Sequence, residues 1–98
     1  MPLVVIVTRD APDRFRGFLS STMLEVAPAT YVSPHMSKGV RERIWKVLQE
    51  WHEALDQGSV VMIWRDNNAT GGVGLSHLGT PPKKLLEIDG MWIARKSG

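Results

Sequence analysis

The chain has 98 residues, with twelve Lys or Arg, ten Asp or Glu and no cysteine. This length fits one domain, and the lack of cysteine excludes disulfides and thiolate metal sites. A formal net charge of +2 is too small to indicate nucleic acid by itself. The first apolar run has no charged segment before it and is too short for a signal peptide or a membrane span, so we expect a soluble, cytoplasmic protein.

The N-terminal part predicts a strand followed by a helix. Leu3–Thr8 is an unbroken apolar, β-branched run, which is typical of a central strand covered by helices. Asp10 is a suitable N-cap, and Pro12 suits the first helical turn. We expect this helix to run to Pro28, because apolar residues recur at helical spacing. Gly17 inside it costs about 1 kcal/mol relative to alanine, and close approach of another backbone would explain its presence. The apolar residues are Phe15, Phe18, Leu19, Met23 and Val26.

The middle of the chain predicts a strand, a helix and a second buried strand. Ala29–Ser33 is a short β-type segment, which Pro34 ends or confines to the edge of a sheet. Ser37 caps the second helix, and Gly58 is a natural residue just beyond its end. Val60–Trp64 is again continuously apolar. The stripe of the second helix consists of Val40, Ile44, Val47, Leu48, Trp51 and Leu55.

The last third predicts a loop over 66–72, a weak strand over 72–78 and a stop at 80–82. Asp89-Gly90 between two apolar runs indicates a hairpin, or equally a turn before a last strand that leaves the domain. The order β-α-β-α-β-β predicts an α/β (α+β) fold with a small, mostly antiparallel sheet and two helices on one face, as in ferredoxin-like plaits. We expect this domain over residues 1–80, and an extra C-terminal strand or tail over 81–98.

Asp10, at the end of the first strand, is the candidate for metal chemistry. Mg²⁺ usually takes one or two carboxylates and keeps several waters. One carboxylate per chain is too few, but a two-fold dimer would bring two copies of Asp10 to one metal ion. Alternatively, Asp10 only caps the helix and complements its dipole.

Basic residues near helix starts are the candidates for phosphate contacts. Arg14 and Arg16 lie in the first turns of the first helix, and Lys38 and Arg41 lie early in the second. The helix dipole disfavours cations there, so their placement favours an anionic partner. Lys83-Lys84 lies in an expected loop, a frequent place for contacts to a nucleic-acid backbone. The alternatives are surface cations paired with nearby carboxylates and a solvated helix face.

An ordered set of motifs covers nearly the whole chain. The motifs are Val4-Val-Ile-Val-Thr8, Pro12-x-Arg14-x-Arg16-Gly17, Leu24-Glu25-Val26-Ala27, Tyr31-Val32, Val40-Arg41-Glu42-x-Ile44-Trp45, Gly58-x-Val-Val-Met-x-Trp64, Asn67, Thr70-Gly71 and Asp89-Gly90. Together they resemble the small core CRISPR-associated adaptation subunit in its subtype I-E form. The resemblance implies a ferredoxin-like fold and a homodimer that bridges two dimers of the CRISPR integrase. That assembly captures short DNA duplexes and inserts them as new spacers.

The resemblance also implies roles for individual residues. Arg14 and Arg16 match basic residues that contact the duplex backbone in the family, and Arg41 matches an arginine of the second-helix motif. Lys38 lies one residue from a DNA-binding lysine of the family, and Lys83-Lys84 resembles a basic pair in the same loop. The C-terminal strand would pair beyond its own domain, on the dimer mate or on the integrase.

The family carries a metal-dependent nuclease label, tied to an acidic residue at the end of the first strand. Its subtype I-E pattern usually has Thr-Glu-Asn where this chain has Thr8-Arg9-Asp10, and a shift of one residue reverses the face of a strand. This departure favours DNA binding over metal chemistry. Our leading hypothesis is therefore a structural dimer that holds duplex DNA by its backbone. The alternative is a Mg²⁺-dependent endonuclease, acting on RNA or DNA, with Asp10 of both protomers at one metal ion.

Overall fold

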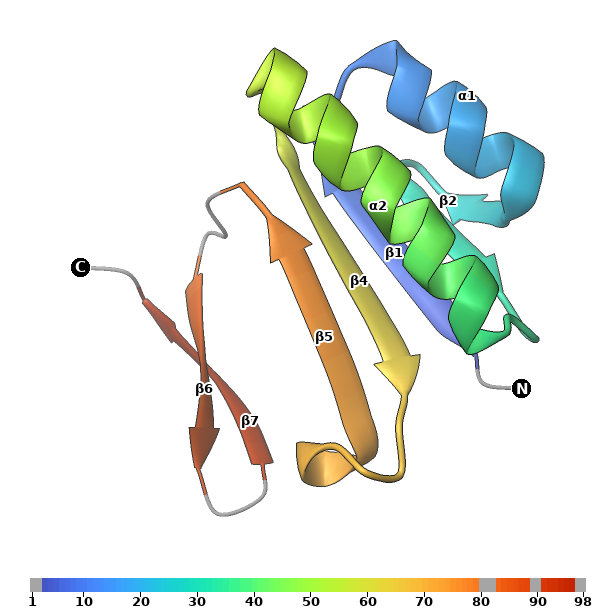
Figure 1. Ribbon diagram of the computed structural model, residues 1–98. Helices are drawn as coiled ribbons and strands as arrows, with labels where there is room; N and C mark the ends of the chain where they lie inside the picture. The colour runs from blue at the N-terminus through green and yellow to red at the C-terminus, as the bar shows by residue number, and fades with distance from the viewer. Residues whose placement is uncertain (1–2, 80–82, 89–90, 97–98) are drawn as a thin grey trace.

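A five-stranded antiparallel sheet carries both helices on one face (Figure 1). The computed structural model describes residues 3–79, 83–88 and 91–96, with side chains described for 3–79. The strands follow the order β2-β3-β1-β4-β5 across the sheet, which confirms the predicted α+β, ferredoxin-like fold. The elements are β1 (Val4–Arg9), α1 (Asp13–Thr22), β2 (Leu24–Ala27), β3 (Thr30–Ser33), α2 (Lys38–Leu55), β4 (Ser59–Arg65), the 3-10 helix η1 (Thr70–Gly72) and β5 (Val73–Leu78).

Strand β2 corrects the predicted order of elements, which lacked it. The expected helix up to Pro28 is wrong, because α1 ends at Thr22 and Leu24–Ala27 form β2, which pairs with β3. The hydroxyls of Ser21 and Thr22 bond back to the carbonyl of Phe18, an arrangement that competes with helix continuation. β3 consequently lies between β2 and β1, inside the sheet, and Pro34 does not mark an edge strand.

Helix α2 begins as predicted and ends differently. The Ser37 hydroxyl accepts a hydrogen bond from the N–H of Val40 at 3.2 Å, which confirms the N-cap. At the other end Asp56 is the C-cap, in the left-handed conformation with φ 45°, and its N–H bonds to the carbonyl of His52. Gly58 also has a positive φ of 78°, two residues further on.

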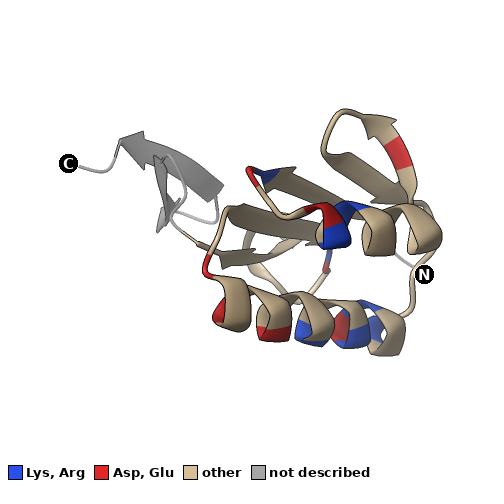
Figure 2. Cartoon of the chain, turned by 90° about the horizontal axis from the view of Figure 1, so that it is seen from above, with Lys and Arg blue, Asp and Glu red and all other residues tan. Residues whose placement is uncertain are grey.

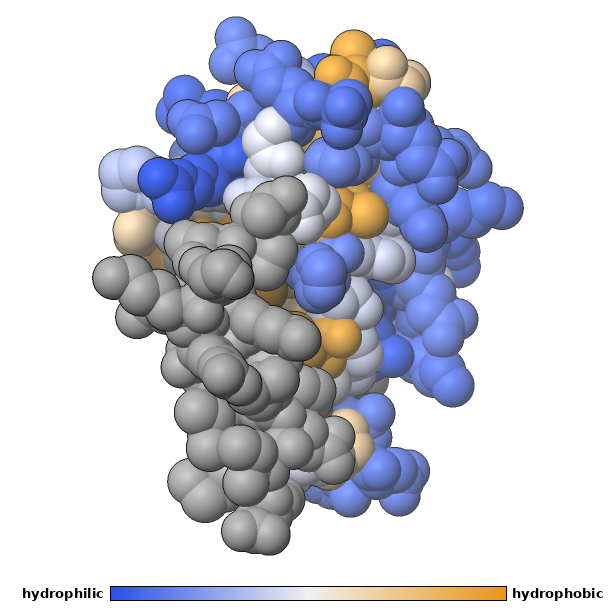
Figure 3. Space-filling model, turned by 90° about the vertical axis from the view of Figure 1, so that its left-hand side faces the viewer, coloured by the Kyte–Doolittle hydropathy of each residue, from blue (hydrophilic) through white to orange (hydrophobic). Residues whose placement is uncertain are grey.

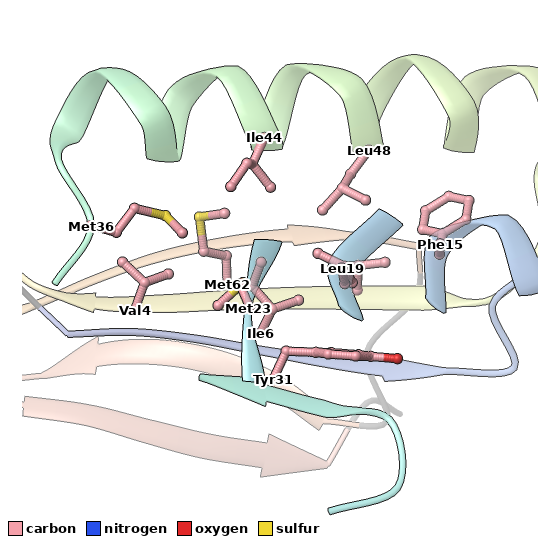
Figure 4. Packing of buried hydrophobic residues seen from close by; sticks show 11 residues of the cluster. Val4, Ile6, Phe15, Leu19, Met23, Tyr31, Met36, Ile44, Leu48 and Met62 are labelled. Atoms are coloured by element: carbon pink, nitrogen blue, oxygen red, sulfur yellow. The ribbon is translucent and has the colours of Figure 1, made fainter. Parts of the chain in front are cut away.

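The hydrophobic core lies between the helices and one face of the sheet (Figure 4). Alternate residues of β1 and β4 point into it, as the two-residue period of a strand requires. Phe15, Leu19 and Leu48 close it from the helices, and Tyr31, from β3, is 1% exposed. The buried residues are Val4, Ile6, Phe15, Leu19, Met23, Tyr31, Met36, Ile44, Leu48, Val60 and Met62.

The opposite face of the sheet is apolar and is not covered by any helix within residues 3–79 (Figure 1). Its side chains meet in cross-strand pairs, among them Val5 with both Val32 and Ile63. Val7, near the middle of this face, is 40% exposed. We call this surface the bare sheet face, defined by Val5, Val7, Val32, Val61, Ile63 and Leu75.

The C-terminal segment contributes two strands, where one extra strand was expected. β6 (Lys83–Ile88) and β7 (Met91–Lys96) pair antiparallel as a separate two-stranded sheet, in line with the predicted hairpin. The predicted turn at 89–90 and the predicted stop at 80–82 lie outside the described residues. The domain boundary at residue 80 and the docking of the tail on another subunit stay predictions. Among the described helices, none combines the length and apolar character that a membrane crossing requires.

Candidate nucleic-acid interface

Asp10 lies at the junction between β1 and α1, but it does not cap the helix. The N-cap is Pro12, which provides no side-chain hydrogen bond, so the predicted N-cap role of Asp10 is wrong. Asp10 instead has a left-handed φ of 54°. Its carboxylate is 85% exposed and lies 4.0 Å from the guanidinium of Arg9. An exposed pair of this kind contributes little to stability.

The loop after α2 packs against this junction from the other side. The side-chain amide of Gln57 donates to the Asp10 carbonyl at 3.3 Å. A Cβ at Gly58 would lie 2.6 Å from the carbonyl oxygens of Arg9 and Asp10, so only glycine fits this close approach. The Gly58 carbonyl in turn lies 3.1 Å from Nε2 of His52. The turn that carries Asp10 is therefore held by the loop after α2 as well as by its own neighbours.

A hollow of about 560 Å³ opens beside this junction, between the start of α1 and the β2–β3 hairpin. Asp10, Asp13 and Glu25 contribute carboxylates to its lining. The guanidinium of Arg16 lies 3.6 Å from the Glu25 carboxylate, so part of its charge is neutralised. Burial raises the pKa of the Tyr31 phenol above its ordinary value of about 10, and the nearby negative charge of Glu25 raises it further.

The carboxylates of this hollow do not form a metal-binding group of three or more ligands within the described residues. Among the described residues, no group of three or more His, Asp or Glu side chains is arranged to hold a metal ion. The Asp10 side chain is exposed and its nearest charged partner is a cation. A site that uses Asp10 therefore depends on donors from outside this chain, as the sequence prediction of a two-copy site already required.

Arg14 lies over an aromatic cluster at the start of α1. Its guanidinium carbon is 4.5 Å from the ring centroid of Trp51, on α2. Trp51 also makes edge-on contacts with Phe15 and Phe18, whose ring centroids lie 5.6 Å and 5.3 Å away. Within residues 3–79, Arg14 forms no ion pair. Its full charge therefore remains available at the surface.

Arg41 has the same kind of support at the start of α2. Its guanidinium carbon is 4.2 Å from the ring centroid of Trp64, on β4, and it too forms no ion pair within the side chains that the structure describes. Lys38, in the same turn, pairs with Glu42 at 3.9 Å instead. The four cations predicted on the helices thus divide into two that stack on tryptophan and two that face a carboxylate.

Trp64 lies flat over the backbone of β5. A Cβ added at Gly74, its cross-strand partner, would overlap the indole atoms Cε2, Nε1 and Cζ2. Arg41, Trp45 and Trp64 line a groove of about 510 Å³ between α2 and β5, with Ser76 on the strand side. From the side on which β5 lies, the described surface is mainly hydrophilic, with small separate hydrophobic spots (Figure 3).

The charges of α2 run against its dipole. The first half of the helix carries all four of its Lys and Arg residues, and the last turns carry Glu50 and Glu53 (Figure 2). A helix N-terminus favours anions and a C-terminus favours cations, so this order does not serve the stability of the helix. It leaves a positive N-terminal end that suits an anionic partner.

The predicted basic residues are not gathered into one cluster. α1 begins at the end of the layer where α2 finishes, so Arg14 and Arg16 lie at the opposite end from Lys38 and Arg41 (Figure 1). Lys83 and Lys84 belong to β6 rather than to the expected loop. Trp51, expected in the apolar stripe of the second helix, and Trp64, expected at the end of a buried strand, are the unexpected members of the site. No sequence spacing links either tryptophan to its arginine.

A comparison with protein families identifies the family of this chain. Residues 3–93 match the model of the family described as CRISPR-associated protein (Cas_Cas2CT1978). The match covers almost all of the ferredoxin-like domain and extends into the C-terminal hairpin. It supports a role in CRISPR-based defence and adaptation. The chain therefore belongs to this Cas2-like family of CRISPR-associated proteins.

Proposed function

We propose that this protein serves CRISPR adaptation as a homodimer that binds duplex DNA through its backbone and bridges integrase subunits. The observation that carries the proposal is the placement of cations at the start of both helices, against the helix dipoles. Arg14 and Arg41 are supported there without a neutralising carboxylate. Contacts of this type to phosphates bind tightly and carry little sequence information.

The bare sheet face supports the homodimer. A two-fold interface uses the same patch on both copies, so a flat apolar patch matches itself. Arg9, the last residue of β1, and Arg65, the last residue of β4, belong to the same face of the sheet as this patch. Because the two strands are antiparallel, the two arginines lie at opposite ends of it. Two copies that pack antiparallel through this face would bury the apolar centre and leave these cations at the rim.

Duplex binding as a function of salt concentration tests the proposal directly. We expect the wild-type protein to bind duplexes of unrelated sequence alike, with an affinity that falls steeply as salt rises. The combined variant Arg14→Ala, Arg16→Ala should weaken binding equally for all sequences, and the salt slope should fall by about 0.9 for each phosphate that the protein no longer neutralises. Arg65→Ala, which removes one positive charge at the rim of the bare sheet face, is the control at protein concentrations at which sedimentation velocity gives it the same mass as the wild type. Unchanged binding by the double variant would refute the proposal.

The integrase bridge is tested by co-purification. An affinity-tagged copy of this chain, expressed with the integrase of the same CRISPR locus, should elute with a fixed stoichiometry that survives nuclease treatment. A deletion of residues 81–98 tests whether the tail carries that contact. Elution of the tagged chain alone, under conditions in which both proteins are folded, would contradict the bridge.

The Mg²⁺-dependent endonuclease remains the second candidate, because Asp10 and Asp13 line one hollow beside a left-handed backbone turn. It needs the Asp10 of a second copy to complete a site. Purified protein is assayed on RNA and DNA with Mg²⁺ and with EDTA, beside Asp10→Ala. Cleavage that survives in Asp10→Ala would exclude this residue as the catalytic one, and cleavage abolished only in that variant would favour the enzyme.

A further inference from the structure

We propose that Trp51 and Trp64 are positioning residues that hold Arg14 and Arg41 in the geometry in which they meet DNA phosphates. The inference rests on the proposed duplex binding and deepens it. Neither tryptophan needs to touch DNA, since each acts through the guanidinium that it supports.

The first pair joins the two helices. Trp51 is fixed by edge-on contacts with Phe15 and Phe18, and Arg14 lies over its ring at 4.5 Å. An exposed arginine normally samples many rotamers, and binding must then immobilise it at a cost in conformational entropy. A guanidinium that already rests on a rigid aromatic face avoids part of that cost. Its N–H groups, which lie in the plane of the guanidinium, stay free to contact a phosphate.

The second pair joins α2 to the sheet. Trp64 lies between the guanidinium of Arg41 and the backbone of Gly74, where no larger residue fits. In this position its indole Nε1 is buried without a hydrogen-bond partner among the described residues. A buried donor without a partner destabilises a fold. The glycine that makes room for the ring and the guanidinium stacked on its other side both favour a role for the flat placement of Trp64 under Arg41.

The two pairs fit a ligand longer than a single phosphate. Trp51 stands ten residues after Arg41 on α2, which corresponds to about 15 Å along the helix axis. Arg14 and Arg41 are therefore separate supports on one side of the sheet. A duplex backbone presents phosphates over such a span, whereas a free nucleotide does not.

Double-mutant cycles on duplex affinity test the inference. Trp51→Leu should weaken binding roughly two- to five-fold, and it should have no further effect once Arg14 is alanine. The same result is expected for Trp64→Leu with Arg41→Ala. The crossed combinations, Trp51→Leu with Arg41→Ala and Trp64→Leu with Arg14→Ala, should be additive. A tryptophan that only supports the fold would give equal effects in both backgrounds.

Two conservative variants keep the test decisive if a leucine variant fails to fold. Arg14→Lys retains the charge but not the planar stacking group, and should lose about as much affinity as Trp51→Leu. Trp51→Phe retains an aromatic face and should keep most of the binding. Full binding by Arg14→Lys, or additive cycles for both matched pairs, would overturn the inference while leaving duplex binding intact. Full binding by Arg14→Ala and Arg41→Ala would instead refute the proposed function itself.

Discussion

The two faces of the sheet differ in what they contribute. The face under the helices holds the whole buried core and carries the supported arginines above it. The other face is just as rich in β-branched residues, yet it is left half exposed. Successive residues of β1 and β4 point to opposite sides, so the same two strands supply apolar side chains to both faces. The buried residues of the described core come from only one of them, which leaves the second available for association.

The largest expected effect is a loss of stability when an isoleucine on the covered face of the sheet is truncated. An isoleucine on the other face provides the comparison. Ile6→Ala removes a side chain that is 0% exposed, and should lower the free energy of unfolding by about 2–5 kcal/mol. Ile63→Ala, on the bare sheet face, should cost the monomer clearly less. Urea unfolding of both variants, at several protein concentrations, measures the difference. Equal losses in the monomer would mean that the bare sheet face is part of the folding core.

Charge on the bare sheet face should separate association from folding. Val7→Asp should raise the dissociation constant of a dimer by roughly a hundredfold or more, because a carboxylate would be buried without a partner. Val40→Asp is the matched control, since Val40 on α2 is 41% exposed against 40% for Val7. Sedimentation velocity measures the mass and circular dichroism the fold. Dimers of unchanged stability in Val7→Asp would place the interface elsewhere.

Gly74→Ala tests whether the sheet beneath α2 affects binding above it. The added Cβ should displace Trp64 and with it Arg41, and weaken duplex binding roughly two- to five-fold. The effect should vanish in the Arg41→Ala background. Gly72→Ala serves as a control glycine, because a Cβ there meets nothing within 4 Å and its positive φ brings strain without touching Trp64.

The buried phenol of Tyr31, in the core beneath the helices, should make the protein less stable at alkaline pH. Its pKa is raised in the folded state, so above the ordinary value of about 10 the unfolded chain releases a proton that the folded chain keeps. The free energy of unfolding should therefore fall as pH rises from that value to the folded pKa. Tyr31 is the single tyrosine, so tyrosinate absorbance reports its titration alone. Tyr31→Phe should remove this part of the pH dependence, and an unshifted titration would contradict the prediction.

A gain rather than a loss of stability is expected at Gly17, on the exposed side of α1. A Cβ there would meet nothing within 4 Å, so the sequence expectation of a closely approaching backbone is not met within the described residues. Gly17→Ala should raise the free energy of unfolding by about 1 kcal/mol. A thermal unfolding curve measures it. A loss of stability would indicate that another copy or partner packs against this turn.

Much of the fold could be predicted from the sequence, because buried strands and amphipathic helices leave direct patterns. The apolar runs predict β1, α2 and β4, and Ser37 marks the start of α2. β2 is missed because Met23 and Val26 continue the helical spacing of α1 and do not have the two-residue period of a strand. Pairing with β3, which no local pattern encodes, decides between helix and strand.

The candidate site was less predictable, for a related reason. The dipole rule drew attention to Arg14 and Arg41, but the partners that distinguish them lie 37 and 23 residues away, at Trp51 and Trp64. Glu25 neutralises Arg16 only because β2 exists. The error at β2 therefore also hid the difference between the two arginines of α1.

The reversed charge order of α2 has a thermodynamic consequence. A helix whose cations crowd its own positive end is destabilised by that repulsion as long as nothing negative lies against it. Added salt should screen the repulsion, and a bound polyanion should remove it more effectively. The free protein is thus expected to hold α2 less tightly than the bound protein does. Melting temperature then becomes a measure of occupancy, even for anionic ligands that have not yet been named.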